Sequence, residues 1–306
     1  MIRDLRPSDI PRQLLPGRLA GSDLAFTRAS IARPKHSFNL LELSRWSFPP
    51  TTAQHAFASV RKTDLNGVAV VRPRNGRRAW ELAHLVCADG TMDDASDLLE
   101  YCAGWVSEQG CERLFLRVPH GHPIARAARR AGFMPAYAED VHGLQRAWPP
   151  AAGEPTLHLR LATAADAHGI FRLYNSVVPA SIRPLTGLTL EQWQDANEAP
   201  GGSVAEYVSE DVGRLRAWLR IAKKGQALTL DAVAHHDTAP LAAGLVADAS
   251  RLAGGRLQPQ WVVPTHQDAI GRVLRDQGWT PRQSYSVFVR MVAKPIKEPA
   301  LVPVQA

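Results

Sequence analysis

The sequence predicts a mixed α/β (α+β) fold that is built twice in one chain, each copy being a mostly antiparallel twisted sheet flanked by helices. The first observation is a repeat. Val118-Pro119, a helical run and Gly132-Phe133 recur 145 or 146 residues later as Val263-Pro264, a second helical run and Gly278-Trp279. The second observation is length. A chain of 306 residues has reached the size at which single hydrophobic cores stop growing, so two domains of similar size are expected.

The third observation is a boundary rich in proline near the middle of the chain. Residues 148–156 contain three prolines and a glycine, which can continue neither a helix nor a central strand. We therefore predict an N-terminal domain over 1–147, a linker over 148–156 and a C-terminal domain over 157–293. Residues 294–306 contain three prolines and no periodicity, and are predicted to form a loose tail.

Each copy is expected to begin with a short strand and a helix. The strands are predicted at residues 2–5 and 157–161. Thr163 suits the N-cap of the second helix, because its hydroxyl can accept a hydrogen bond from a free backbone N–H. In both copies an arginine of the strand precedes an aspartate of the helix by six residues, namely Arg3 and Asp9, and Arg160 and Asp166.

Antiparallel strands come next in both copies. Strands over 67–72 and 79–86 flank Asn75-Gly76, and this dipeptide favours a tight hairpin because both residues tolerate a positive φ. The second copy repeats the arrangement with strands over 214–221 and 227–234 around residues 223–225.

A long amphipathic helix and a further strand follow each hairpin. The helices are predicted over 94–109 and 239–252, and the strands over 113–118 and 260–263. A strand–helix–strand connection makes the two strands parallel, so the sheet is expected to splay beside each long helix. A second helix and a closing hairpin, with residues 285–292 as the last strand, complete the pattern.

Composition limits the classes of function. Lys and Arg number 36 against 29 Asp and Glu, a formal charge of +7, without a block of like charge, so a dedicated nucleic-acid arm is not indicated. Three cysteines without a CxxC pair argue against a disulfide framework or a zinc site and favour reduced thiols in the cytoplasm. The sequence has neither a signal-peptide pattern nor an apolar run of about 18 residues, so we expect no membrane association.

This order of elements resembles the GNAT N-acetyltransferase superfamily, as two tandem copies that cover nearly the whole chain. The resemblance rests on the Arg-x5-Asp spacing, on Trp80-Glu81-Leu82 in the fourth strand, and on Gly132-Phe133 and Gly278-Trp279 after the last helix. It implies that acetyl-CoA or another acyl-CoA binds where two neighbouring strands diverge. It also implies that the pyrophosphate binds a glycine-rich loop at a helix N-terminus, where backbone donors and the helix dipole favour an anion.

Both copies depart from that loop pattern. The first loop has one glycine, no arginine and the carboxylates Asp89, Asp93 and Asp94, and the second has no glycine but has Pro240. Two like charges 4 Å apart repel by about 4 kcal/mol at an effective dielectric constant of 20, so these carboxylates oppose a pyrophosphate. The positions that would contact the cofactor by this resemblance are Val86, Gly90, Met92, Val233 and His235.

The expected acid–base groups are also incomplete. The resemblance implies a general base on the fourth strand, and Glu81 occupies that strand on the side opposite Trp80 and Leu82. The alternative is an exposed carboxylate paired with Arg72 on the neighbouring strand. The tyrosine that family members carry four residues before the helix-ending glycine is replaced by alanine or leucine. Tyr137 and Tyr285 lie nearby in sequence and are interpreted as packing residues.

Two further clusters carry alternatives. Arg72, Arg74, Arg77 and Arg78 surround the Asn75-Gly76 turn and form either a solvated tip or a phosphate-binding one. His84 lies on the same strand as Glu81 and is interpreted as a weak partner for it. His235-His236-Asp237 is interpreted as a solvated loop, with a metal or base cluster as the alternative, and His120 and His122 as a polar loop at a strand end, with a ligand contact by one of them as the alternative.

Three functions remain open. The degenerate loops favour a tandem module that has lost acetyl-CoA catalysis and binds a small-molecule ligand or a protein partner. The first alternative is an acyl-CoA-dependent N-acyltransferase that acts on a small amine or a protein amine, with Glu81 as the base. The second is nucleic-acid binding through the arginine tip.

Overall fold

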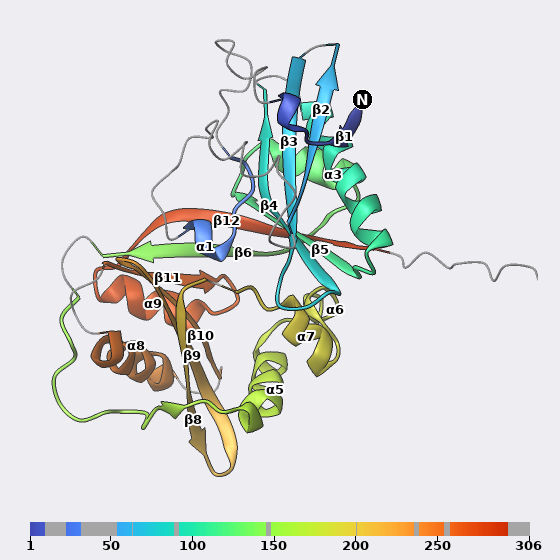
Figure 1. Ribbon diagram of the computed structural model, residues 1–306. Coiled ribbons are helices and arrows are strands. Elements are labelled where there is room, and N and C mark those ends of the chain that lie inside the picture. Colours follow the sequence, from blue (N-terminus) through green and yellow to red (C-terminus); the bar gives the residue numbers. More distant parts are fainter. Residues whose placement is uncertain are drawn as a thin grey trace, which may run out of the picture.

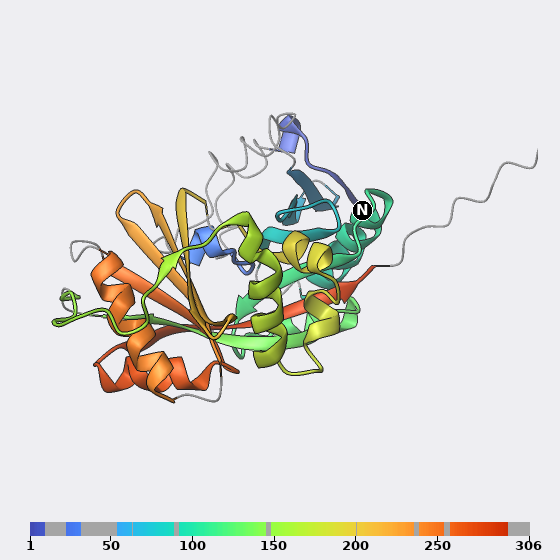
Figure 2. The same cartoon turned by 90° about the horizontal axis from the view of Figure 1, so that it is seen from below.

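A computed structural model describes residues 1–9, 23–31, 54–62, 64–88, 92–144, 148–199, 201–235, 239–253 and 258–292. One twelve-stranded sheet runs through this part of the chain, and helices cover both of its faces (Figures 1 and 2). No helix among the described residues is long and apolar enough to cross a membrane.

In its described residues, the N-terminal copy supplies six strands and four helices of different lengths. They are β1 (Ile2–Asp4), η1 (Pro7–Asp9), α1 (Arg28–Ile31), β2 (His55–Arg61), β3 (Asp64–Pro73), β4 (Ala79–Cys87), α3 (Met92–Glu108), β5 (Arg113–Pro119), α4 (Ile124–Arg130) and β6 (Met134–Gly143). The predicted Asn75-Gly76 hairpin joins β3 to β4. Asp93 and Asp94 lie in the first turn of α3, where the helix dipole favours carboxylates.

The C-terminal copy repeats this order with additional helices near its start. Its elements are β7 (Arg160–Leu161), η3 (Ala164–Asp166), α5 (Ala167–Val177), α6 (Arg183–Thr186), α7 (Leu190–Ala196), β8 (Ser203–Asp211), β9 (Arg214–Lys224), β10 (Ala227–Ala234), α8 (Ala239–Ala253), β11 (Gln258–Pro264), α9 (Asp268–Asp276) and β12 (Thr280–Met291). The strand predicted over 157–161 is reduced to the two residues of β7. The short helices α6 and α7 and the strand β8 were not predicted.

The repeated Gly-aromatic motif ends α4 and α9 in the same way. Gly132 and Gly278 have φ values of +76° and +86°, a conformation that glycine adopts without strain. The next residue, Phe133 or Trp279, donates its N–H to the last turn of the helix at 3.0 Å, and its ring is buried. The motif therefore recurs because it stops the helix and returns an aromatic ring to the core.

The two copies exchange their last strands. The sheet order is β1-β2-β3-β4-β5-β12-β6-β11-β10-β9-β8-β7, so β12 follows β5 of the other copy and β6 lies beside β11. Leu116 faces Phe288, and His142 faces Trp261. The expected closing hairpin after α9 is therefore wrong for the described residues. The alternation along a strand determines which side is buried but not which strand becomes its neighbour.

Separate cores lie on the two faces. Helices α3 and α4 cover one face of the N-terminal copy, and α8 and α9 cover the same face of the C-terminal copy, while α5 and α7 pack on the opposite face (Figure 2). The predicted linker contains no helix or strand in its described residues. Its Trp148 is nonetheless buried, with ring centroids 5.0 Å from Trp279 and 6.2 Å from Trp261. The domain limits themselves stay a prediction.

Candidate functional site

Each copy contains a gap between two parallel strands. Strands β4 and β5 pair only from Ala79 to Glu81, and β10 and β11 pair only as far as Leu230 and Trp261. Beyond these residues the strands run on without pairing to each other. We call the two gaps the N-terminal opening and the C-terminal opening.

The N-terminal opening contains another part of the same chain. Leu24 donates its N–H to the Leu85 carbonyl of β4 at 2.8 Å, and Phe26 donates its N–H to the Arg117 carbonyl of β5 at 2.9 Å. The Asp23 carboxylate accepts the Leu85 N–H at 3.0 Å and lies 2.5 Å from the His84 ring. Residues 23–27 therefore bridge the two diverging strands and form hydrogen bonds with backbone groups that face the gap.

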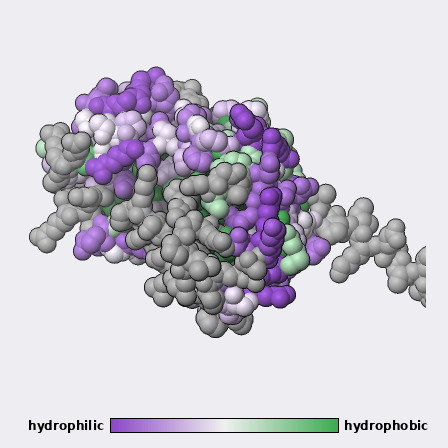
Figure 3. All heavy atoms as spheres, turned by 90° about the horizontal axis from the view of Figure 1, so that it is seen from above, coloured by the Kyte–Doolittle hydropathy of each residue, from purple (hydrophilic) through white to green (hydrophobic). Residues whose placement is uncertain are grey.

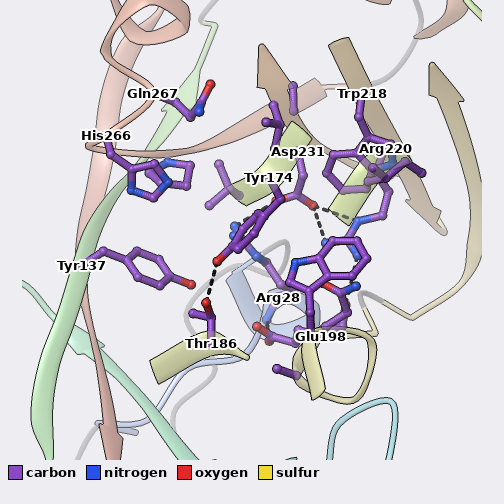
Figure 4. A pocket seen from close by; sticks show the side chains of 18 of the residues that line it. Arg28, Tyr137, Tyr174, Thr186, Glu198, Trp218, Arg220, Asp231, His266 and Gln267 are labelled. Carbon is purple, nitrogen blue, oxygen red and sulfur yellow. Dashed lines mark hydrogen bonds and ion pairs between the residues drawn. The ribbon is translucent and has the colours of Figure 1, made fainter. Parts of the chain in front are cut away.

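The C-terminal opening leads to a cavity of about 880 Å³, counted with the solvent at its mouth. We call it the central cavity. Asp231 and Val233 of β10 and Val262 of β11 line it at the opening, α5 and α7 cover it, and the N-terminal copy closes it from the other side (Figure 4). Because β6 is exchanged, its Tyr137 lies in the cavity of the other copy, and the residue that follows the bridging segment, Arg28, does the same.

Buried ion pairs hold the wall of the central cavity. Arg28 and Arg220 each approach Asp231 at 3.1 Å. Arg117 binds Glu139 at 2.5 Å and Glu198 at 2.8 Å, and so links both copies. Each of these carboxylates is at most 6% exposed, a burial that carboxylates tolerate only when paired.

Two carboxyl groups of this cluster titrate in opposite directions. Burial and the neighbouring Glu198 raise the pKa of Glu81 above its usual range. Arg117 and Arg74 hold the pKa of Glu198 well below its usual range, despite burial. Glu198 is therefore held as a carboxylate by the arginines around it.

Four side chains of the cavity can exchange protons or form hydrogen bonds. The Tyr137 and His266 rings meet edge to face, with centroids 5.9 Å apart, and burial raises the pKa of Tyr137 so that its hydroxyl stays protonated. Gln267 accepts the Ala234 N–H at 3.2 Å and thereby spans the C-terminal opening. The Tyr174 hydroxyl points into the cavity and donates to Thr186 at 2.9 Å (Figure 4).

Comparison with known proteins identifies this architecture. A GCN5-related N-acetyltransferase from Sphaerobacter thermophilus is 14% identical, with a TM-score of 0.55 over 95% of each chain. A tandem GNAT protein from the clavulanic acid biosynthesis pathway is 13% identical, with a TM-score of 0.51 over 96% of this chain and 98% of that one. The chain has the tandem GNAT fold. No protein-family model matches it, and no curated protein matches its sequence.

The tandem GNAT fold brings together only part of the predicted site. Val233 lines the central cavity, whereas His235 lies in a separate polar groove beside α5. Val86 is buried in a small core of the N-terminal copy, and Met92 packs at the start of α3. Gly90 lies outside the described residues. The cofactor role of these five positions stays a prediction.

Glu81 is buried rather than exposed. It is 2% exposed and pairs with Arg72 at 2.6 Å and with Arg74 at 3.1 Å, so the expected cross-strand pair is confirmed and its expected exposure is wrong. Glu81 does not line the central cavity, and its role as a base stays a prediction. The reason for its burial is α7, which packs over this end of β4 and was not predicted.

The arginine tip is docked rather than solvated. Arg74 lies 3.6 Å from the centroid of the Phe115 ring, and its side chain is 6% exposed. Arg78 binds Glu191, and the Asn75 N–H donates to the Asp195 carbonyl at 3.2 Å, so the hairpin rests on α7. Of the four tip arginines only Arg77 is fully at the surface.

The remaining candidates lie away from the cavity. His120 lies 2.9 Å from Ser286 at the exposed end of β5. The thiols of Cys87, Cys102 and Cys111 are buried, and burial raises the pKa of each, so none is suited to attack as a thiolate. The described surface in Figure 3 is mostly hydrophilic, with hydrophobic residues in small separate areas.

Sequence reasoning missed the groups that line the central cavity. Tyr137 was interpreted as a packing residue, and Arg28, Asp231, His266 and Gln267 were not singled out. The one signal in the sequence was Asp231, a carboxylate inside the otherwise apolar strand Ala227–Ala234. Arg28 and Tyr137 reach the cavity only because residues 23–31 and β6 cross to the other copy, whereas His266 and Gln267 follow β11 of the C-terminal copy itself.

Proposed function

We propose that this protein is an acyl-CoA-dependent N-acyltransferase with one working site, at the C-terminal opening. The observation that carries the proposal is the continuous path from the gap between β10 and β11 into the central cavity. The tandem GNAT fold supports the class of reaction, and the cavity supplies the space for an amine. The N-terminal opening is excluded from this role by residues 23–27.

The backbone at the C-terminal opening suits an extended amide ligand. Ala234 turns its N–H toward the gap, where it meets Gln267, and Ala232 faces the same way because alternate strand residues do. Among the described residues, no segment pairs with Ala232 on this side. The pantetheine arm of coenzyme A contains two amides and could pair with this edge as an added strand does.

The side chains can assist the transfer at two atoms. Acyl-CoA, when bound, supplies a thioester whose carbonyl carbon an amine can attack. In our proposal His266 accepts the proton that the amine loses, since imidazole is the side chain suited to accept protons near neutral pH. The Tyr137 hydroxyl donates a proton to the departing sulfur. Asp231, bound by two arginines, holds the wall rather than acting as a base.

The competing proposal is a module that binds without catalysis. It is favoured by the ion-paired state of Asp231 and by the absence of a glycine-rich loop in the sequence. Calorimetry of the full chain with acetyl-CoA, followed by a thiol-release assay with a panel of amines, separates the two. Binding with turnover supports the transferase, and binding without turnover on any amine supports the module.

A backbone variant tests the site itself. Ala232→Pro removes the N–H that faces the gap and leaves the hydrogen bonds of β10 to β9 in place, so we expect acetyl-CoA affinity to fall about tenfold or more. Arg77→Ala, at the surface, is the matched control. Equal affinity in Ala232→Pro and wild type, with unfolding curves that coincide, would place the ligand elsewhere.

The proton donor has its own variant. Tyr137→Phe removes only the hydroxyl, and we expect kcat to fall by about 10² while the acetyl-CoA affinity stays the same, the size typical of one general acid. The pH profile is the second readout. Because the pKa of Tyr137 is raised, activity is expected to persist into alkaline solution and to be lost only as pH rises through that raised value.

A further inference from the structure

The charged groups around the central cavity do not balance. The carboxylates are Glu81, Glu139, Glu198 and Asp231, and the guanidinium groups that bind them are Arg28, Arg72, Arg74, Arg117 and Arg220. Four negative charges therefore face five positive ones, and every carboxylate is already bound by at least two arginines. Counted over the described residues, the cluster has a surplus of one positive charge and no carboxylate left for a cationic ligand.

The uncharged polar groups of the cavity also favour a ligand that accepts hydrogen bonds. Gln267 is 4% exposed, and while its Oε1 accepts the Ala234 N–H, its amide nitrogen is buried without a hydrogen-bond partner. The Tyr137 side chain also lines the cavity, and its hydroxyl can donate a hydrogen bond there. Both atoms are donors. A buried donor without a partner is costly, so a ligand that brings an acceptor is favoured.

The remaining wall is aromatic. Trp193 and Trp218 are 8% and 9% exposed, and with Tyr174 and Phe115 they line the cavity. Rings of this kind bury large apolar area at fixed geometry. The cavity therefore combines a flat apolar wall with hydrogen-bond donors and a surplus of positive charge.

We propose that the acceptor of this site is an amine that also carries a carboxylate and has an aromatic or apolar body. The carboxylate of the ligand would neutralise the surplus positive charge and accept hydrogen bonds from the cavity donors. The aromatic or apolar part of the ligand would pack on the tryptophans. The positive surroundings also disfavour the ammonium form of the acceptor, which leaves more of it as the neutral amine that can attack. The role of this ligand as the acyl acceptor rests on the proposed transferase function. The class of ligand does not, since it can be measured by binding alone.

The binding test uses two probes that differ only in their polar end. They are 3-phenylpropanoate, an anion, and phenethylamine, a cation with the same ring and chain length. Tryptophan fluorescence and calorimetry on the full chain are expected to show the anion binding about tenfold tighter or more, the size of one charge-assisted hydrogen bond. Equal or tighter binding of phenethylamine overturns the proposal.

Two variants locate the preference. Arg220→Gln brings the cluster to neutrality, and Gln267→Met removes one donor without changing charge; each is expected to reduce the preference for the anion, and Arg77→Gln is expected to preserve it. If Arg220→Gln unfolds, Gln267→Met alone decides. A preference that neither folded variant reduces assigns the anion to another site and overturns the proposal.

The transfer assay separates this inference from the proposed function. With acetyl-CoA present, phenylalanine is expected to have a higher kcat/KM than phenethylamine. If phenethylamine is the better acceptor, the substrate class is wrong and the transferase stands. If acetyl-CoA does not bind but 3-phenylpropanoate does, the transferase is wrong and the ligand class stands.

Discussion

The two openings of this molecule have the same origin in the sheet and different contents. In each copy two parallel strands pair for three or four residues and then diverge beside a long helix. Residues 23–27 bridge the N-terminal opening, whereas the C-terminal opening leads into the central cavity. The difference teaches that a duplicated fold can use one copy to complete the other, because the segment that closes the first opening continues directly into Arg28 of the second site.

The strand exchange has the same consequence. Strand β6 belongs to the N-terminal copy in sequence, but its Tyr137 and Glu139 lie at the central cavity. The C-terminal copy alone would lack Tyr137, the three arginines Arg28, Arg74 and Arg117, and the Glu139 carboxylate that binds two of them. The two copies therefore build one cavity together rather than one cavity each.

The largest expected effect breaks the link between the copies. Arg117→Ala leaves Glu139 and Glu198 buried without their main partner, and we expect the free energy of unfolding to fall by about 3–5 kcal/mol. Urea unfolding followed by tryptophan fluorescence measures it. Arg77→Ala, at the surface, should change stability by no more than about 0.5 kcal/mol. A loss of similar size in both variants would mean that the buried cluster does not join the copies.

The next effect loosens the segment that bridges the N-terminal opening. Asp23→Ala removes the acceptor of the Leu85 N–H and the partner of His84, and a loss of about 1–3 kcal/mol is expected. Hydrogen exchange gives the sharper readout, because the Leu85 amide should exchange faster while the Leu230 amide of β10 should not change.

The matched control for that variant is Asp140→Ala, which removes an exposed carboxylate that binds Ser284 at 2.6 Å on the neighbouring strand. It should leave the Leu85 amide as protected as in the wild type. Unchanged exchange at Leu85 in Asp23→Ala would show that the bridging segment is held by other contacts.

The sequence predicts the local part of this comparison well. Asn75-Gly76, the Gly-aromatic helix ends and the alternation of the strands are short-range signals, and the hairpin, the caps and the strands that they predict are present. The tandem GNAT fold follows from the order of these elements. The strand exchange does not follow from it. An antiparallel strand with one buried face shows the same alternation of apolar and polar residues whichever copy it pairs with.

The site was less predictable for a physical reason. Strand alternation predicts Glu81 to be a surface group, and the hairpin tip predicts the same for Arg74. Helix α7 packs over this region and buries both side chains. A charged residue becomes a core residue only through a partner that is distant in sequence, such as Glu198 for Arg74. No pattern within a single strand contains that partner.

A smaller effect is the loss of stability in alkaline solution, which should differ between the two copies. All three cysteines belong to the N-terminal copy, and burial raises the pKa of Cys87 and of Cys111 to about 12 from the ordinary 9.0. The unfolded chain therefore ionises first, so the stabilisation is complete below pH 9 and is lost as pH rises toward 12. Each thiol should cost about 1.4 kcal/mol of unfolding free energy per pH unit in that window.

Urea unfolding in reductant at pH 8, 9 and 10 measures this slope. Cys111→Ala should reduce it by the share of one thiol, and amide exchange in β4 should accelerate with pH beyond its intrinsic rate before exchange in β10 does. A slope that Cys111→Ala leaves unchanged would assign the alkaline loss to other groups, such as Tyr285, whose pKa burial raises to about 12.

The smallest expected effect comes from an ion pair that recurs in both copies with the same spacing. Arg3 binds Asp9 at 2.7 Å with the Asp9 side chain fully buried, whereas Arg160 binds Asp166 at the same distance with 46% of the arginine side chain exposed. Arg160→Ala should therefore have little effect on stability, as is usual for exposed pairs. Arg3→Ala should lower the free energy of unfolding more, because it leaves a buried carboxylate without this partner.

The same pair also makes stability depend on pH. Arg160 and the Thr163 N–H lower the pKa of Asp166, so the contribution of Asp166 to stability is present above pH 3.8 and is lost as pH falls below it. Acid unfolding curves of the two variants measure the difference, and equal losses would mean that the repeated pair has one role in both copies.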